Sequence, residues 1–510
     1  MNVVFRVDAS LAIGSGHVMR CITLAQRMRN CGFKCHFICR EHTGNFIRYI
    51  EQLGFLVHGL PASSSSQSRV NNEYPLPLHA QWLGSSWELD KQLTSEILNI
   101  LGSVGWLIID HYAIDARWER ALKDYCDRIL VIDDLADRQH YCDLLIDQTL
   151  ERTFYDYKNL VPQETKVLVG PKYALLRDSF VLAREQAYSI NAPNNLSRIL
   201  VSMGGVDEKN ATLKVLQQLV KNEKYLVTVL LGPNAPHYKD VSAYCSKYSN
   251  IKHIQFTNDI AALMLESDIS IGAAGSTSWE RACLGLPSIV IPLADNQREI
   301  AQKLDVAKAA ILIELDDIDS SLAKKIAEIA VRWESIHNAN FRLCDGLGVN
   351  RLMLELSKLE CPSKLKYELV PARHADIQKV FDWQSSSLTR QYALNSEMPS
   401  WRAHQNWMQE KLSQTKDYFY IISETQNHIK LGVVRLDWLS KGYYLVSIYV
   451  DPENYGLGIA AEALANLDHL HPHVTIEAVV LKENKASQRL FEKANYQRLT
   501  GEKFIRGPIV

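Results

Sequence analysis

The chain lacks any apolar run approaching the roughly 20 residues that a membrane-spanning helix needs, and it has no basic N-terminal segment followed by a long apolar stretch. It also lacks a charge excess, because 56 lysines and arginines stand against 58 aspartates and glutamates, for a formal net charge of -2. Nucleic-acid and membrane-surface proteins usually carry a basic excess. We therefore expect a cytoplasmic protein with no nucleic-acid and no membrane partner.

Two nucleotide motifs are missing as well. Neither the Gly-x-Gly-x-x-Gly fingerprint nor the P-loop pattern occurs, which argues against a dinucleotide-dependent oxidoreductase and a P-loop enzyme. Among the 10 cysteines, Cys31, Cys35 and Cys39 lie close together in sequence. Cys35 and Cys39 fall on one face of a predicted strand at residues 34–40, as buried thiols would. We expect no metal site.

The 510 residues, 47% of them hydrophobic, are enough for about three domains at the usual size of about 150 residues. Strand and helix patterns alternate up to about residue 360 and change after it. We expect an N-terminal Rossmann-like domain at residues 1–190, a second at 191–360 with a closing helix, and a mixed α/β domain at 362–510. A segment with four consecutive serines, at residues 61–67, is interpreted as a solvated loop.

The stretch from Gly14 to Arg20 is the centre of the first domain. It follows an apolar strand pattern at residues 3–7 and precedes a helical pattern that continues to Met28. Its glycines let a ligand approach the backbone, and His17 lies at the helix N-terminus, where the dipole disfavours imidazolium and leaves the ring able to accept a proton. The alternative is a glycine-rich turn whose histidine only caps the helix.

Polar residues follow two further predicted strands, at residues 106–110 and 129–134. Because the carboxyl ends of parallel strands border the ligand crevice, Asp110, Tyr112 and Asp133 are candidates for the site. Aspartates at such positions also cap the next helix, and that interpretation stays open. More strands of this domain are predicted at residues 55–58 and 166–170.

The second domain repeats this arrangement with small residues after its strands. Its first strand runs into Gly204, and a later one runs into the loop from Gly275 to Thr277, whose N–H and hydroxyl groups can bind phosphate. Glu280 can accept hydrogen bonds from ribose hydroxyls, and a further strand leads to Asn296. A nucleotide on the second domain with chemistry from the first is the layout of the GT-B class. The predicted strands are residues 198–202, 225–231, 268–273 and 286–292.

Together these motifs carry a resemblance that none carries alone. In chain order they are Gly14-Ser15-Gly16-His17 with Arg20, Asp110-His111-Tyr112, Asp133-Asp134, Gly170-Pro171-Lys172-Tyr173-Ala174-Leu175-Leu176-Arg177, Ser202-Met203-Gly204-Gly205 and Gly275-Ser276-Thr277-Ser278-Trp279-Glu280-Arg281. Over its first two domains the chain resembles the UDP-sugar hydrolases of pseudaminic acid biosynthesis. That family releases UDP from UDP-2,4-diacetamido-2,4,6-trideoxy-β-L-altropyranose.

The resemblance implies a base, a sugar site and a UDP site. The catalytic base is His17. The residues expected to bind the sugar and the attacking water are Gly16, Arg20, Tyr112, Asn296 and Gln297. Those expected to bind UDP are Gly204, Gly205, Gly275, Ser276, Thr277 and Glu280. Water would attack the anomeric carbon with inversion, and because UDP is a good leaving group, one base and donors on the diphosphate suffice without a general acid.

From Tyr367 onward the pattern changes. Strands are predicted at residues 367–372, 418–422, 431–436, 443–450 and 475–481, and a helix at 376–383. The fourth of these strands runs into Asp451-Pro452-Glu453-Asn454-Tyr455-Gly456-Leu457-Gly458-Ile459-Ala460, a second phosphate-binding loop before a helix. With the later Asn484-Lys485-Ala486-Ser487-Gln488-Arg489-Leu490-Phe491, this order resembles the GNAT acetyltransferases. In that family the loop amides bind the coenzyme A pyrophosphate, and the asparagine-bearing helix contacts the pantetheine arm.

This second resemblance implies acetyl-CoA as co-substrate. Its expected contacts are Val450, Tyr455, Gly456, Gly458, Ile459, Ala460, Asn484 and Ser487. Glu453 stands where that family's loop usually has Arg or Gln, and Phe491 stands where many members have the tyrosine that protonates the leaving thiolate. The general acid stays open among Tyr496, Tyr449 and Glu424, with a core position favoured for Tyr496.

The combined hypothesis is a bifunctional enzyme that N-acetylates the 4-amino group of a precursor UDP-sugar and then hydrolyses the acetylated UDP-sugar. A second reading is a GT-B glycosyltransferase, with an acceptor hydroxyl in place of water. A third is a hydrolase whose C-terminal domain is a non-catalytic acyl-CoA-binding module, and Glu453 and Phe491 are the best arguments for it.

Overall fold

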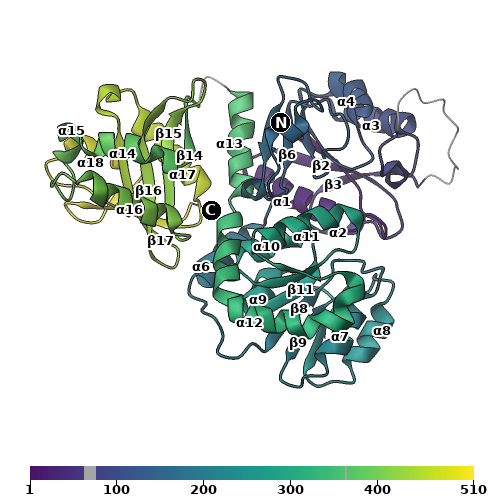
Figure 1. The fold of residues 1–510 in the computed structure, drawn as a ribbon. Helices are drawn as coiled ribbons and strands as arrows, with labels where there is room; N and C mark the ends of the chain where they lie inside the picture. Colours follow the sequence, from purple (N-terminus) through teal and green to yellow (C-terminus); the bar gives the residue numbers. More distant parts are fainter. Residues whose placement is uncertain (63–75, 362–364, 510) are drawn as a thin grey trace. The chain divides into compact units, whose positions relative to one another are not determined.

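The computed structural model describes residues 1–62, 76–361 and 365–509 (Figure 1). The chain forms two compact units, Met1–Val349 and Asn350–Val510. The four serines of the expected loop, and Pro362 and Ser363 at the expected domain boundary, lie outside the described residues. Within the described part of the chain, no helix is long and apolar enough to cross a membrane.

The first lobe of the N-terminal unit is built on a parallel sheet in the order β3-β2-β1-β4-β5-β6-β7. Its central strands are buried on both faces, which explains why they read as continuous apolar runs. Every strand predicted here is present, but β6 was missed because its apolar run is very short. The strands are β1 (Asn2–Val7), β2 (Lys34–Arg40), β3 (Leu56–Leu60), β4 (Val104–Asp110), β5 (Arg128–Ile132), β6 (Leu144–Asp147) and β7 (Lys166–Val169).

The second lobe of this unit repeats the same winding in the order β10-β9-β8-β11-β12-β13, again parallel throughout. Two such lobes form the GT-B-like pair that the sequence predicted. The short strands β10 and β13 were not predicted. The strands are β8 (Arg198–Ser202), β9 (Leu226–Leu230), β10 (Ile251–Ile254), β11 (Ile269–Ala273), β12 (Ser288–Ile291) and β13 (Ile311–Leu312).

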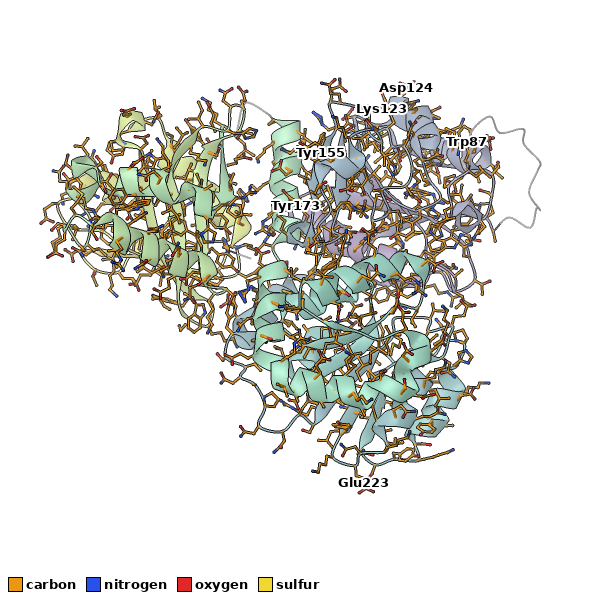
Figure 2. All side chains as sticks on the ribbon, in the orientation of Figure 1. Trp87, Lys123, Asp124, Tyr155, Tyr173 and Glu223 are labelled. Carbon is orange, nitrogen blue, oxygen red and sulfur yellow. The ribbon has the colours of Figure 1, made fainter. Side chains whose placement is uncertain are left out.

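Helices pack against both sheets through apolar faces. The longest, α12 (Ile318–Leu343), buries Ile329, Trp333 and Ile336 in the core of the second lobe, and the Trp333 indole donates to the Asp268 carbonyl at 2.8 Å. The others in this unit are α1 (Gly16–Asn30), α2 (Ile47–Gln52), α3 (Trp87–Leu101), α4 (Ala116–Leu122), α5 (Phe154–Tyr157), α6 (Asp178–Ala187), α7 (Ala211–Leu219), α8 (Tyr238–Cys245), α9 (Ile260–Leu265), α10 (Thr277–Cys283) and α11 (Asp295–Val306). Tyr155 and Glu223, labelled in Figure 2, are exposed.

The C-terminal unit has a mixed sheet in the order β14-β15-β16-β17-β18-β20-β19. Antiparallel strands lead to β17, which pairs in parallel with β18 only from Tyr443 to Val446. Beyond Val446, β17 continues along β16 alone, so the sheet opens between β17 and β18. The strands are β14 (Tyr367–Pro371), β15 (Tyr418–Glu424), β16 (Lys430–Ser440), β17 (Tyr443–Val450), β18 (Thr475–Val479), β19 (Gln497–Arg498) and β20 (Lys503–Arg506).

The helices of this unit are α14 (Ile377–Gln384), α15 (Ser387–Arg390), α16 (Trp401–Ser413), α17 (Ile459–Leu470) and α18 (Lys485–Lys493), together with most of α13 (Gly348–Glu360). In α13, the Asn350 amide donates to the Leu470 carbonyl at 3.1 Å, and Leu354 packs against the core of this unit. The division between the units at Val349 therefore lies earlier in the chain than the boundary expected near Cys361. The sequence did not predict α16.

Candidate functional site

His17 and Asp110 meet at the carboxyl edge of the first sheet. His17 lies in the first turn of α1, just after β1, and Asp110 ends β4. Because β1 and β4 are neighbouring parallel strands, with Val7 opposite Asp110, both segments end at the same edge. The His17 Nδ1 and Asp110 Oδ1 atoms are 2.5 Å apart. The interpretation of Asp110 as a site residue therefore has a direct geometric basis.

The carboxylate determines which ring nitrogen of His17 is free. Burial alone would raise the pKa of Asp110, but the charges of Arg20 and His17 outweigh it and hold that pKa below its usual range. An ionised carboxylate only accepts hydrogen bonds, so Nδ1 carries a proton and donates it to Asp110. In a neutral ring, Nε2 then has the free lone pair. His17 is thus arranged to accept a proton at Nε2.

Arg20 is a buried neighbour of this pair. Its guanidinium donates to both Asp110 oxygens, at 2.6 and 2.7 Å, and to Asp134 at 2.6 Å. The Arg20 side chain is only 6% exposed. Arg20 was expected to bind substrate, whereas the structure places its charge between two carboxylates, where it fixes the carboxylate that orients His17.

A group of aromatic side chains lies beside His17. Its ring meets Tyr112 edge to face, with centroids 4.5 Å apart, and the Tyr112 hydroxyl donates to Asp134 at 2.9 Å. Trp82 stacks on Tyr112 with centroids 5.8 Å apart, and His79 packs beside both. A small pocket is lined by Ile13, His17, Trp82, Asp110, His111 and Tyr112. Sequence reasoning missed Trp82 and His79, because the segment around the 3-10 helix Ala80–Leu83 has no periodic pattern.

Asp133, the third candidate from the strand ends, lies elsewhere. Its buried carboxylate accepts from Arg138 at 2.8 Å, from the Tyr157 hydroxyl at 2.8 Å and from the Ala136 amide at 2.8 Å. Burial would raise its pKa, but Arg138 more than compensates and lowers it. Asp133 therefore stabilises the turn that follows β5. Its neighbour Asp134 is the residue that contacts Arg20 and Tyr112.

Loops of the second lobe lie directly opposite this edge. A Cβ atom on Gly16 would be 3.3 Å from the Ser276 hydroxyl oxygen, and one on Gly205 would be 3.2 Å from the Ser15 hydroxyl oxygen. A Cβ on Gly275 would meet nothing within 4 Å. The structure thus brings Gly205 and Ser276, two of the residues expected to bind UDP, to within contact distance of the turn that carries His17.

The remaining predicted residues of this site border the same loops. Glu280 lies 3.6 Å from Arg177, and burial raises its pKa despite that arginine. Asn296 and Gln297 lie in the first turn of α11, where the Gln297 side-chain oxygen accepts from the Leu293 amide at 3.0 Å. Asn296 is half-buried and Gln297 is engaged with its own turn.

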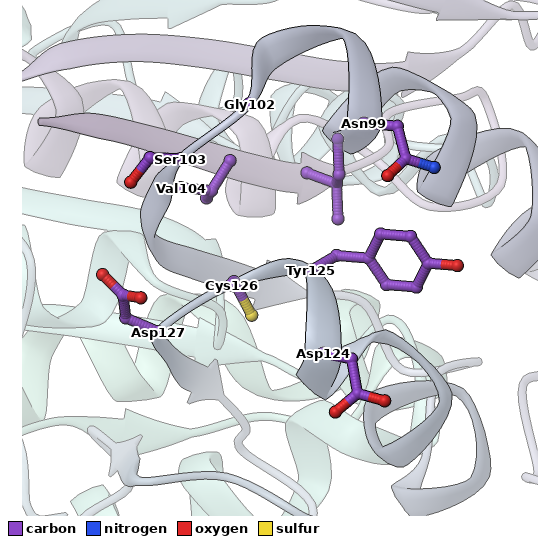
Figure 3. Close-up of a pocket in the computed structure, with 9 residues that line it drawn as sticks. Asn99, Gly102, Ser103, Val104, Asp124, Tyr125, Cys126 and Asp127 are labelled. Carbon is purple, nitrogen blue, oxygen red and sulfur yellow. The ribbon is translucent and has the colours of Figure 1, made fainter.

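A separate pocket of about 330 Å³ is not part of this site (Figure 3). Residues from the end of α3 and from the amino ends of β4 and β5 line it, among them Asn99, Ser103, Tyr125 and Asp127. In parallel sheets the ligand crevice lies at the opposite, carboxyl edge. His17 and Asp110 are at that carboxyl edge.

Potential metal ligands do not cluster in the described part of the chain, since no group of three or more His, Cys, Asp or Glu side chains there could hold an ion. Cys35 and Cys39 are buried in β2, and Cys31 is exposed after α1.

The loop expected to bind the coenzyme A pyrophosphate lies between β17 and α17 of the C-terminal unit. Gly456 and Gly458 both have left-handed backbones, with φ of 83° and 80°, and a Cβ on either would meet nothing within 4 Å. Gly458 directly precedes α17, which begins with Ile459 and Ala460. Val450 ends β17 beside the opening between β17 and β18, and Tyr455 is 51% exposed. The loop amides, the helix start and the open sheet edge therefore meet in one place.

Asn484 and Phe491 lie on the second helix of this site. The Asn484 side-chain oxygen accepts from the Ser487 amide at 3.0 Å and caps α18. Phe491 is 3% exposed and packs against Tyr496 and Phe504 in the core. Tyr496 is equally buried, which agrees with the core position favoured for it.

Comparisons with known proteins divide the chain in the same way as its sheets. Residues 199–339 match the glycosyltransferase family 28 C-terminal domain, and residues 366–497 match the acetyltransferase (GNAT) domain. The UDP-2,4-diacetamido-2,4,6-trideoxy-beta-L-altropyranose hydrolase of Campylobacter jejuni subsp. jejuni is 28% identical over 308 residues, which is 59% of this chain and 95% of that protein.

Two further comparisons concern overall architecture. An uncharacterized protein of Methanocaldococcus jannaschii is 22% identical over 98% of this chain and 97% of its own length. The solved structure of Acinetobacter baumannii MurG covers 70% of this chain and 99% of its own, with 13% identity and a TM-score of 0.47. By sequence, the first part of the chain is thus similar to the UDP-2,4-diacetamido-2,4,6-trideoxy-β-L-altropyranose hydrolase of Campylobacter jejuni, and its last part matches the GNAT acetyltransferase domain.

Proposed function

We propose that the N-terminal unit hydrolyses UDP-2,4-diacetamido-2,4,6-trideoxy-β-L-altropyranose to UDP and the free sugar. The observation that carries this proposal is the His17–Asp110 pair, whose turn lies within contact distance of the Ser276 loop. A base with a free Nε2 next to a phosphate-binding loop suits attack on the carbon that bears the diphosphate. The name of the Campylobacter jejuni relative supports the identity of the sugar.

In the proposed reaction, Nε2 of His17 accepts a proton from water as the water oxygen bonds to the anomeric carbon. The bond from that carbon to the diphosphate oxygen breaks, the electron pair leaves with UDP, and the configuration inverts. Asp110 stabilises the imidazolium that forms, and Arg20 keeps Asp110 ionised and in place. The absence of a side chain at Gly16 lets the Ser276 hydroxyl come close to the turn that carries His17, since a Cβ there would be 3.3 Å from it.

UDP is assigned to the second lobe. The N–H and hydroxyl groups of Gly275, Ser276 and Thr277, together with the backbone of Gly204 and Gly205, would receive the diphosphate. Glu280 would accept from the ribose hydroxyls. The sugar would then lie between these loops and the pocket formed by His17 and Tyr112.

The test of the hydrolase is the His17→Asn variant of the full chain, assayed for UDP release from the UDP-sugar with no acceptor added. Positioned general-base catalysis contributes about 10²- to 10⁴-fold, so turnover should fall by that factor while substrate binding is largely kept. His428→Asn is the control, because His428 lies in an exposed turn with a φ of 56°, which asparagine adopts readily. Near-normal turnover in His17→Asn would exclude His17 as the base.

We further propose that the C-terminal unit transfers acetyl from acetyl-CoA to the 4-amino group of the precursor UDP-sugar. The supporting observations are the Gly456 and Gly458 loop, the opening beyond Val446 and the GNAT match. The amine attacks the thioester carbonyl, coenzyme A leaves as the thiol, and the amine loses one proton. The product would be the substrate of the hydrolase, which explains the fusion economically.

Mass spectrometry of the full chain with the 4-amino UDP-sugar and acetyl-CoA tests this second activity. The expected result is gain of one acetyl group, followed by release of UDP. Binding of acetyl-CoA without acetyl transfer would favour the non-catalytic acyl-CoA-binding module instead.

A further inference from the structure

Arg281, in α10 of the second lobe, is a buried cation without a carboxylate partner. Its residue is 1% exposed. Its Nη2 atom donates to the Ala273 carbonyl and to the Ser278 hydroxyl, both at 2.9 Å. Its Nε and Nη1 atoms are buried and have no hydrogen-bond partner among the described residues. Buried charges are normally paired, so this exception calls for a physical reason.

Two other buried arginines of this unit, Arg6 and Arg20, are each paired with two carboxylates. Arg6 contacts Asp8 and Asp90, and Arg20 contacts Asp110 and Asp134. Arg281 differs from them, because burial lowers its pKa to about 10 and only the more distant charge of Glu280 opposes this. The side chain remains a cation at neutral pH, and it would be stabilised by any anion bound nearby.

The guanidinium lies directly beneath the two loops assigned to the nucleotide. A Cβ atom on Gly272 would be 2.9 Å from Arg281 Nη1 and 2.3 Å from the Ser202 carbonyl oxygen. The absence of a side chain at Gly272 therefore makes room for the guanidinium between the ends of β8 and β11. Those two strands run into the loops 203–205 and 274–277.

We propose that Arg281 is a positioning residue of the nucleotide site, whose buried positive charge stabilises the diphosphate of bound UDP through the 273–278 loop without touching it. This inference rests on the proposed UDP site. The same charge favours departure of UDP, because negative charge accumulates on the diphosphate as the bond to the sugar breaks. At a separation of several ångströms in a partly buried site, one unit charge changes affinity for a multiply charged ligand by about 10- to 100-fold.

The test measures binding of UDP, UMP and uridine to the full chain by calorimetry and competition. Arg281→Met removes the charge and keeps a side chain of similar bulk. It should weaken the binding of UDP by about 10- to 100-fold, the binding of UMP less, and the binding of uridine little. Arg281→Lys restores the charge and should recover most of the UDP affinity. The matched control is Arg198→Gln, since Arg198 pairs with Asp268 at the opposite end of β8.

Equal weakening of UDP and uridine in Arg281→Met would show that the arginine only holds the loop, and unchanged UDP affinity would overturn the proposal outright. If Arg281→Met does not fold, Arg281→Gln, which can still donate to the Ala273 carbonyl, takes its place in the same comparison. Failure of the wild-type chain to bind UDP would instead contradict the proposed hydrolase site, so the two failures are distinguishable.

Discussion

His17 and Asp110 are linked through Nδ1 and Oδ1 at 2.5 Å, and this contact leaves Nε2 as the proton-accepting atom of the ring. The two residues are far apart in sequence and come together because β1 and β4 are adjacent in the sheet. Arg20 bonds both oxygens of Asp110 from the buried side. The reactivity assigned to His17 therefore depends on the negative charge of Asp110, which Arg20 holds in place.

Asp110→Asn should lower turnover by about 10²- to 10⁴-fold, because an amide at this position can donate to Nδ1 and place the ring proton on Nε2. Steady-state kinetics of UDP release measures the effect, and KM should change little. The control is Asp115→Asn, since Asp115 caps α4 and asparagine is an equally good N-cap. If KM and turnover fell in the same way in both variants, the result would contradict the role of Asp110 in setting the tautomer of His17.

Gly14 and Gly16 should respond differently to alanine. Gly14 has a φ of 80° and open space around it, so Gly14→Ala should lower the free energy of unfolding by about 1 kcal/mol with little effect on KM. Gly16 has an ordinary helical backbone but faces the Ser276 hydroxyl, so Gly16→Ala should raise KM for the UDP-sugar and leave unfolding nearly unchanged. Denaturant unfolding and steady-state kinetics of both variants test this difference. The prediction is wrong if Gly14→Ala raises KM while Gly16→Ala lowers the free energy of unfolding.

Asp147 should give the N-terminal unit a measurable pH dependence. Burial, together with the charge of Asp134, raises its pKa to about 6, although Arg152 donates to it at 2.6 Å. Between the unfolded value of about 4 and pH 6, the folded state therefore binds the extra proton, and stability declines as pH rises. Wild type should lose stability relative to Asp147→Asn from about pH 4 to about pH 6 in urea unfolding. A difference that stays constant across this range would contradict the assignment.

The acetyl-CoA loop can be tested with two glycines of equal backbone strain. Gly458→Ala and Gly442→Ala both place alanine at a positive φ, 80° and 64°, in open space. Each substitution should lower the local conformational stability by about 1–2 kcal/mol. Only Gly458, however, precedes α17 at the proposed pyrophosphate site. We expect acetyl-CoA binding to weaken about tenfold or more in Gly458→Ala alone, by calorimetry. Equal affinities in the two variants would remove this loop from the coenzyme site.

The sequence predicted much of this architecture, because long apolar runs specify buried parallel strands directly. Lys34–Arg40 and Tyr443–Val450 were predicted with the bounds that the structure shows. In contrast, Leu144–Asp147 was missed, since four residues give too short a pattern. Periodicity indicates which faces are apolar, but it does not give the loop positions that bring Trp82 to Tyr112.

The same limit explains Arg20. The resemblance to the UDP-sugar hydrolases implied a substrate contact for Arg20, and no sequence pattern indicated a buried one. Only the fold shows that the buried Asp110 and the half-buried Asp134 both form ion pairs with its guanidinium. Likewise, the sequence motif that contains Arg281 gave no sign that its guanidinium is unpaired.

The most direct test of the central claim is hydrolysis of the UDP-sugar by the full chain in ¹⁸O-labelled water, with no acceptor present. If water attacks the anomeric carbon, UDP is released, the label appears on the anomeric carbon of the sugar, and NMR of the first product shows inverted configuration. Release of UDP only after an acceptor is added, or label in the UDP phosphate, would contradict attack by water at the anomeric carbon.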